Sequence, residues 1–123
     1  MNDYIAKAMV KNGQISIYAG VTTNTVETAR ILHNMLPTPT VALGRVLTGA
    51  ALMSQTLKAI NQTITIQIKG DGPIGGIVVV TDYQAGVRGY VHNPYFDLSL
   101  NDAGKFDIKG AVGSGRLSVI KDL

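Results

Sequence analysis

Residues 63–80 read TITIQIKGDGPIGGIVVV, and this stretch decides the fold. In its first part Ile64, Ile66 and Ile68 alternate with polar residues, as is typical of a strand with one buried face. The turn-rich segment 70–76 follows, and the apolar run 77–80 after it has the length of a central strand. We therefore predict two successive strands joined by a glycine-rich hairpin connector.

Further strands are expected downstream of this pair. Residues 87–92 and 116–121 are both strand-like. Between them, residues 95–107 have no regular pattern, and the glycine-rich segment 110–115 is expected to be a mobile connection. The carboxyl-terminal half of the chain is therefore predicted to supply four strands.

Upstream, the chain is expected to begin with a hairpin. Residues 3–10 and 15–21 are strand-like, and Asn12-Gly13 lies between them. Asn-Gly tolerates the positive φ angles of a type I′ turn, whose twist matches that of the flanking strands. We therefore expect two antiparallel strands joined by this turn.

Two helices are predicted between the hairpin and the later strands. Asn24 and Glu27 have the spacing of a capping box, and Pro37 ends the first helix. Thr38 is the candidate N-cap of the second helix, with a proline at its first position. The apolar stripe of this second helix runs over residues 40–60.

The order β-β-α-α-β-β-β-β predicts an α+β fold, with two helices packed on one face of a largely antiparallel sheet. Gly44 and Gly49 each cost the second helix about 1 kcal/mol, so a neighbouring helix or sheet is expected to approach closely there. We see no repeat and no linker. Residues 1–123 are therefore expected to form a single domain.

The composition excludes several kinds of site. The chain has 123 residues, no cysteine and only two histidines, so it offers no disulfide, no thiolate zinc site and no thiol nucleophile. We expect no cofactor in this chain. No apolar run reaches the ~20 residues of a membrane span, and the start of the chain lacks the pattern of a signal peptide. A cytoplasmic location without a membrane partner is expected.

The glycine-rich connector is the most obvious candidate for chemistry. Gly70, Gly72 and Gly75 have the G-x-G-x-x-G spacing, which cradles phosphate where it leads from a strand into a helix. Here a strand follows instead, and Asp71 would repel phosphate, so the hairpin connector is the favoured interpretation. A small-molecule enzyme that binds phosphate stays open as an alternative.

No other pattern indicates catalysis. Asp97, Asp102 and Asp107 lie in or beside the irregular stretch, where aspartate suits turns and caps. No nucleophile or base accompanies them. His33 lies on or beside the apolar stripe of the first helix, and we expect it to be packed or snorkelling rather than catalytic. The chain is therefore predicted not to be an enzyme.

Charge and aromatic residues leave binding functions open. Eleven basic and eight acidic residues give a net charge of +3. The basic residues are scattered, which is typical of a solvated surface and does not favour nucleic acid as a partner. Tyr4, Tyr18 and Tyr90 are predicted to share the sheet face away from the helices. Tyrosines there can stack on bases, contact apolar segments of other proteins, or simply suit a strand.

Several separated motifs, in order, resemble those of one family. Residues 66–75, IQIKGDGPIG, are similar to the I-x-G-D-G-P-x-G segment of the redox-regulated 33-kDa chaperonin, the heat shock protein 33 family. Other segments with the same resemblance are 38–40 (TPT), 42–45 (ALGR), 49–53 (GAALM), 87–91 (VRGYV), 93–94 (NP) and 110–122 (GAVGSGRLSVIKD). The resemblance covers essentially the whole chain.

The resemblance implies a bacterial, cytoplasmic, ATP-independent holdase that binds unfolded client proteins and prevents their aggregation. Members of the family have an N-terminal α+β core, a helical linker and a C-terminal module in which four cysteines hold zinc. Oxidation there releases zinc, unfolds the linker and uncovers the client-binding surface. This chain resembles the N-terminal core alone, so zinc and redox control are expected in a missing C-terminal segment, and no metal ligand carries over.

The resemblance also indicates the partners. Members dimerise through this core, sometimes by exchanging elements, and an open strand edge at the end of the chain predicts self-association, most simply as a dimer. We expect Tyr4, Tyr18 and Tyr90 to contact client proteins. A basic nucleic-acid-binding module remains the alternative, and it predicts an affinity that falls steeply with salt.

Overall fold

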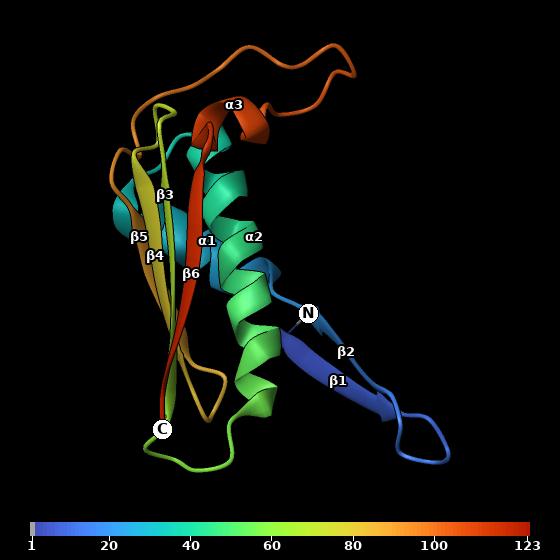
Figure 1. Cartoon of the computed structure of the whole chain (residues 1–123). Helices are drawn as coiled ribbons and strands as arrows, with labels where there is room; N and C mark the ends of the chain where they lie inside the picture. Colours follow the sequence, from blue (N-terminus) through green and yellow to red (C-terminus); the bar gives the residue numbers. More distant parts are fainter. Residues whose placement is uncertain (1) are drawn as a thin grey trace.

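A four-stranded antiparallel sheet and a separate hairpin form the β part of the computed structural model, which describes residues 2–123 (Figure 1). The elements are β1 (Tyr4–Met9), β2 (Ser16–Val21), α1 (Thr23–His33), α2 (Pro37–Met53), η1 (Ser54–Thr56), β3 (Thr63–Gly70), β4 (Gly76–Asp82), β5 (Val87–Val91), α3 (Ile108–Val112) and β6 (Gly115–Asp122). The predicted α+β class and the order of strands and long helices are confirmed. The short α3 is an addition that we did not predict.

The four-stranded sheet has the order β5-β4-β3-β6, so β3 and β4 are its inner strands. Ile66 of β3 pairs with Val79 of β4 on one side and with Val119 of β6 on the other. Because paired residues point to the same side of a sheet, the buried residues Ile64 and Ile66 of β3 and Ile77 and Val79 of β4 share one face. That face is the one that the helices cover.

The hydrophobic core lies between this face and α2. Its largest fully buried members from the helix and from the two inner strands are Leu43, Leu47, Ile64, Ile77 and Val79. The long α2 packs chiefly on β4 and β5, and α1 packs on β5 and α2. No helix within residues 2–123 is long and apolar enough to cross a membrane.

The start of α1 differs from the prediction. Thr22 precedes the helix without a side-chain capping bond, and the expected capping box of Asn24 and Glu27 does not form. Instead the carboxylate of Asp3, next to β1, accepts the N–H of Asn24 at 3.0 Å and the N–H of Thr25 at 2.7 Å. Glu27 bonds to Arg30, one helical turn further on. A charged acceptor is favoured here because a helix N-terminus carries partial positive charge.

The boundary between the two helices also lies elsewhere. Helix α1 ends at His33, four residues before the predicted stop, because Asn34 adopts a left-handed conformation with φ of 50°. Leu36 takes the N-cap position of α2, and Pro37 is its first residue. The prediction of Thr38 as the N-cap is therefore wrong: its side chain is buried and donates to Asp97 at 2.5 Å.

Helix α2 is shorter than its apolar stripe suggests. It ends at Met53, and the chain reaches β3 through η1 and a turn. Leu57 is still buried, but Ile60 at the predicted helix end is 71% exposed. Of the two glycines in α2, Gly44 makes the expected close approach, since a Cβ there would lie 2.9 Å from Val26 Cγ1. A Cβ on Gly49 would meet no described atom within 4 Å, so that part of the prediction is wrong.

The predicted hairpin forms as a sheet of its own, which projects away from α2 (Figure 1). Its turn is not type I′, because only Gly13 has a positive φ, of 73°, whereas Asn12 does not. The Gly13 N–H donates to the Val10 carbonyl at 2.8 Å, and the Val10 N–H donates to the Ile15 carbonyl at 3.0 Å. The longer loop lets the side chain of Asn12 accept the Gln14 N–H at 3.1 Å.

Candidate functional site

The glycine-rich connector between β3 and β4 is packed against the segment that leads into β6. The N–H groups of Asp71, Gly72 and Ile74 donate to carbonyls of residues 111–114 at 3.0–3.1 Å. A Cβ on Gly70 would lie 2.1 Å from the Val112 carbonyl oxygen, so only glycine allows this contact. Because these N–H groups are already bonded, the connector is structural and presents no phosphate cradle.

The same contacts change the interpretation of residues 110–115. Residues 108–112 form α3, whose N-terminus is capped by Asp107 accepting the Gly110 N–H at 2.9 Å. Ser114 donates its N–H to the Asp71 carboxylate at 2.8 Å. The expected mobile connection is therefore a short helix and turn that are bonded to the connector.

Two of the aspartates in and beside the irregular stretch are engaged in structural hydrogen bonds. Asp97 accepts the Thr38 hydroxyl and the Leu98 N–H, and Asp107 caps α3, so both have structural roles. Within residues 2–123 no three side chains of His, Cys, Asp or Glu lie together as metal ligands. The chain also has no cysteine. The thiolate zinc site that the resemblance implies for the family therefore does not fit the residues present.

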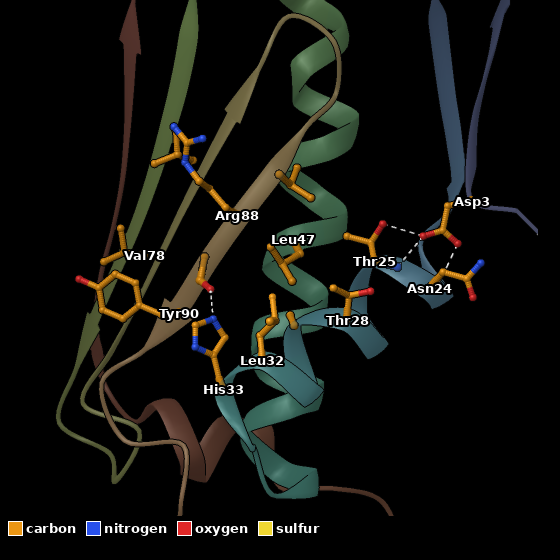
Figure 2. A pocket seen from close by; sticks show the side chains of 14 residues that line it. Asp3, Asn24, Thr25, Thr28, Leu32, His33, Leu47, Val78, Arg88 and Tyr90 are labelled. Carbon is orange, nitrogen blue, oxygen red and sulfur yellow. Dashed lines mark hydrogen bonds between the residues drawn. The ribbon is translucent and has the colours of Figure 1, made fainter.

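A groove runs along β5, between this strand and α1, with a volume of about 660 Å³ (Figure 2). Its lining is mostly apolar. The residues are Asp3, Asn24, Thr25, Thr28, Ala29, Leu32, His33, Leu47, Val78, Val80, Val87, Arg88, Gly89 and Tyr90. We call this cavity the β5 groove. A large apolar pocket with a few polar groups is the usual form of a binding site.

His33, the last residue of α1, joins the two walls of the β5 groove. Its ring is partly buried, and Nε2 donates to the Gly89 carbonyl oxygen at 2.9 Å (Figure 2). The expected packing of His33 is confirmed. Leu32, beside it, is 75% exposed and extends from α1 at the same wall.

Asp3 lies at one end of the β5 groove, and its carboxylate already accepts hydrogen bonds from α1. The Thr25 hydroxyl donates to it at 2.6 Å, and the N–H groups of Asn24 and Thr25 donate as well. These bonds stabilise the carboxylate and hold the pKa of Asp3 below its ordinary value, with the Thr25 hydroxyl as the largest cause. Asp3 therefore positions α1 rather than offering a free acceptor.

Arg88 and Tyr90 form the opposite wall, on the sheet face away from the helices (Figure 2). Tyr90 is 46% exposed and stacks on His92, with ring centroids 5.9 Å apart. Arg88 is exposed, and among residues 2–123 it makes no ion pair. The groove thus has an unpaired cation on its rim.

The three tyrosines predicted to share one surface do not do so. Tyr4 and Tyr18 belong to the hairpin, and Tyr90 belongs to the four-stranded sheet. Within the hairpin Tyr4 pairs with Val21 and Tyr18 pairs with Lys7. These pairs alternate along the strands, so Tyr4 and Tyr18 point to opposite faces. The prediction of a common surface is wrong because the strands form two sheets. The role of each tyrosine in client contact stays a prediction.

Large apolar side chains are exposed at two further places. On the hairpin, Met9, Ile15 and Ile17 are each more than half exposed. On β6, Leu117 is 62% and Val119 is 41% exposed, although both lie on the face that the helices cover further along the sheet. Such side chains mark surfaces that contact other molecules or other segments.

Comparisons with known proteins agree on one family. A family model described as Hsp33 protein matches residues 3–123. The 33 kDa chaperonin of Acetivibrio thermocellus is 59% identical over the whole of this chain, and that of Ruminiclostridium cellulolyticum is 49% identical. The chain covers 42% of each of these relatives.

A solved structure is also similar. The crystal structure of the 33 kDa chaperonin (heat shock protein 33 homolog) from Thermotoga maritima superposes with a TM-score of 0.93 at 39% identity. The alignment covers 97% of this chain and 41% of that one. The likeness therefore extends over the whole fold described above, and this chain spans about two fifths of the length of the proteins it matches.

Proposed function

Because this chain belongs to the Hsp33 family, we propose that it is the core of an ATP-independent holdase that binds unfolded proteins and prevents their aggregation. The family is named for a chaperonin, and a chaperonin is not a class of enzyme. We also propose the cytoplasm as its place of action.

The observation that carries the proposal is the amount of apolar surface on a folded core. Leu32 at the β5 groove is 75% exposed, Leu117 on β6 is 62% exposed, and Ile17 on the hairpin is 55% exposed. A holdase needs apolar surface that captures other unfolded chains, and it needs no catalytic side chains. Tyr90 lines the groove and Tyr4 and Tyr18 are on the hairpin, so we propose that they contact clients at two separate surfaces.

Redox regulation is proposed for the part of the longer relatives that this chain does not span. The 123 residues contain no cysteine, so neither oxidation of thiols nor thiolate binding of zinc has a place here. This chain then supplies client-binding surface, and the switch that masks it belongs to other residues.

Self-association, most simply as a dimer, is also proposed. β6 is an edge strand whose apolar side chains are exposed on both of its faces, and unpaired edges of this kind readily add another strand. The exposed hairpin offers a second surface for contact between copies.

The test is suppression of aggregation. The purified chain is mixed with a thermally unfolding client protein, and light scattering is followed with and without peroxide. We expect equal suppression in both conditions, because the chain has no thiol to oxidise.

Absence of suppression at several-fold molar excess would contradict the proposal for this chain.

A parallel measurement with labelled single-stranded RNA tests the alternative function. Binding that is tight at low salt and lost at high salt would favour a nucleic-acid module, because counterion release dominates such binding.

A further inference from the structure

In the sheet formed by the described residues, the outer strand β5 has one edge without a partner strand. Hydrogen bonds from His92 N to the Gly76 carbonyl and from Asp82 N to the Gly86 carbonyl flank the β4–β5 ladder. Bonded and non-bonded pairs alternate in an antiparallel ladder. The backbone groups of Arg88 and Tyr90 therefore face β4, and those of Val87, Gly89 and Val91 face outward.

The outward groups are largely free. The Gly89 carbonyl accepts from His33 at 2.9 Å. Within residues 2–123 the structure shows no acceptor for the outward N–H groups of Val87, Gly89 and Val91. An extended chain laid along this edge would find N–H donors at alternate residues, which is the pattern that strand addition uses. It would also displace the His33 ring from the Gly89 carbonyl.

The β5 groove provides space for the side chains of such a strand. Successive side chains of an extended segment point to opposite sides. On one side they would meet Thr28 and Leu32 of α1, and on the other they would meet Val80 and Tyr90. A volume of about 660 Å³ accommodates more than one large apolar side chain.

The charge of the groove points to an acidic residue in its occupant. Asp3 is engaged by the N-terminus of α1, whereas Arg88 has no carboxylate partner among the described residues. A glutamate or aspartate in the bound segment would pair with this guanidinium at the rim.

We propose that the free edge of β5 binds an extended segment of an unfolded polypeptide as an added strand, with apolar side chains in the β5 groove and an acidic side chain at Arg88. This inference rests on the proposed function and specifies the client class: a β-capable segment with alternating apolar residues and one acid.

The test uses a fluorescein-labelled eight-residue peptide of alternating leucine and serine with one glutamate in place of a serine. Two further peptides are N-methylated at either the odd or the even residues. We expect the parent peptide to bind by fluorescence anisotropy. One methylated peptide should lose at least about tenfold in affinity and the other should be unchanged, because only one set of N–H groups faces β5.

Matched substitutions test whether the peptide binds in the β5 groove. Leu32→Ser should weaken binding at least about fivefold, because it removes apolar contact area. Ile31→Ser changes the neighbouring exposed residue outside the groove, 62% exposed in the structure, and should have no effect. Arg88→Gln should weaken binding and reduce its salt dependence, whereas Arg45→Gln on α2 should do neither.

Two results would overturn the inference: no binding of the parent peptide, or equal binding of both methylated peptides. Aggregation suppression separates this failure from failure of the proposed function. A chain that suppresses aggregation but treats both methylated peptides alike is a holdase that binds clients in another way. A chain that binds one peptide selectively but does not suppress aggregation adds strands without being a holdase.

Discussion

The first turn of α1 depends on a side chain from outside the helix. Asp3 precedes β1, and its carboxylate accepts two N–H groups and one hydroxyl at the helix start. No acidic residue lies in the first turn of α1 itself. Asp3 therefore ties the start of β1 to the helix that forms one wall of the β5 groove.

We predict that Asp3→Asn lowers the melting temperature by a few degrees at neutral pH, because a neutral amide replaces a charged capping group. The folded-state pKa of Asp3 is lowered, so its contribution is fully present above the ordinary aspartate pKa. It is lost as the pH falls through the lowered value. Thermal melts of both chains at decreasing pH should therefore converge.

The control for this prediction is Asp102→Asn. Asp102 is exposed in the irregular stretch, and its side chain has no hydrogen bond within residues 2–123. This variant should have the same melting temperature as the parent chain at every pH. A constant difference between parent and Asp3→Asn down to strongly acid pH would contradict the capping role.

The two glycines of α2 make a matched pair for a second prediction. Gly49→Ala should raise the free energy of unfolding by about 0.5–1 kcal/mol, because its Cβ enters open space and alanine favours the helix. Gly44→Ala should lower it by about 1–3 kcal/mol, since the new methyl group crowds Val26. Urea unfolding measures both, and Gly44→Ala combined with Val26→Ala should recover part of the loss.

Local spacing predicted some of these residue roles and missed others. The close approach at Gly44 followed from the cost of glycine in a helix. The cap of α1 did not, because Asn24 and Glu27 match a local pattern whereas Asp3 acts from 21 residues away. His33 was expected to pack, but its partner Gly89 is 56 residues distant. Contacts at such separations depend on the tertiary fold.

At the scale of elements, β6 is an edge strand with exposed apolar side chains. It pairs with β3 along its whole length, and within residues 2–123 its other edge has no partner strand. Leu117, Val119 and Ile120 expose apolar side chains on both faces. A strand of this kind favours pairing with a second copy.

We predict that the chain self-associates and that Val119→Lys shifts it to the monomer, because a charge on an edge strand opposes pairing. Size-exclusion chromatography with multi-angle light scattering measures the mass at high protein concentration. Ile60→Lys makes the same change of charge at a loop residue that is 71% exposed, and it should leave the mass of the assembly unchanged.

If the parent chain has the mass of a monomer at high concentration, this result would contradict an interface of any kind. Equal dissociation by both lysine variants would also contradict the β6 interface, since it would show an effect of net charge alone.

Periodicity was a good guide to strands and a poorer one to helix ends. Alternation over 64–69 placed β3 correctly because a half-buried strand needs it. The stripe over 40–60 overran the end of α2, because Leu57 is buried through an extended segment and so continues the apolar spacing without being helical. The five-residue α3 contains Gly110, and its stability comes from contacts that spacing does not reveal.

For the whole molecule, we predict that replacing Tyr4, Tyr18 and Tyr90 with serine weakens aggregation suppression severalfold without unfolding the chain. The side chains of Tyr4 and Tyr90 are about half exposed, so their loss removes apolar contact area with little effect on the core. Suppression and far-UV circular dichroism are measured on the same samples.

Because the tyrosines lie on two sheets, Tyr90→Ser and the double variant Tyr4→Ser/Tyr18→Ser should be compared. A loss confined to Tyr90→Ser would place client contact at the β5 groove, and a loss confined to the double variant would place it on the hairpin. Unchanged suppression in the triple variant would overturn the tyrosine assignment.

The fold class was predictable from the sequence because each element has its own pattern of apolar residues. The candidate site was not. The β5 groove combines α1 and β5, which are more than fifty residues apart, and neither element has a motif for it. The shared tyrosine surface failed for a related reason, since strand patterns do not say how strands divide into sheets.

The sheet order has a consequence for synthesis of the chain on the ribosome. β3 pairs with β6, and even the nearest paired residues, Gly70 and Gly115, are about 45 residues apart. At about 5–20 residues per second, β3, β4 and β5 emerge several seconds before β6 is complete. During that interval the inner strand β3 has an unpaired edge beside Ile64 and Ile66. The nascent chain is thus itself briefly in need of protection from aggregation.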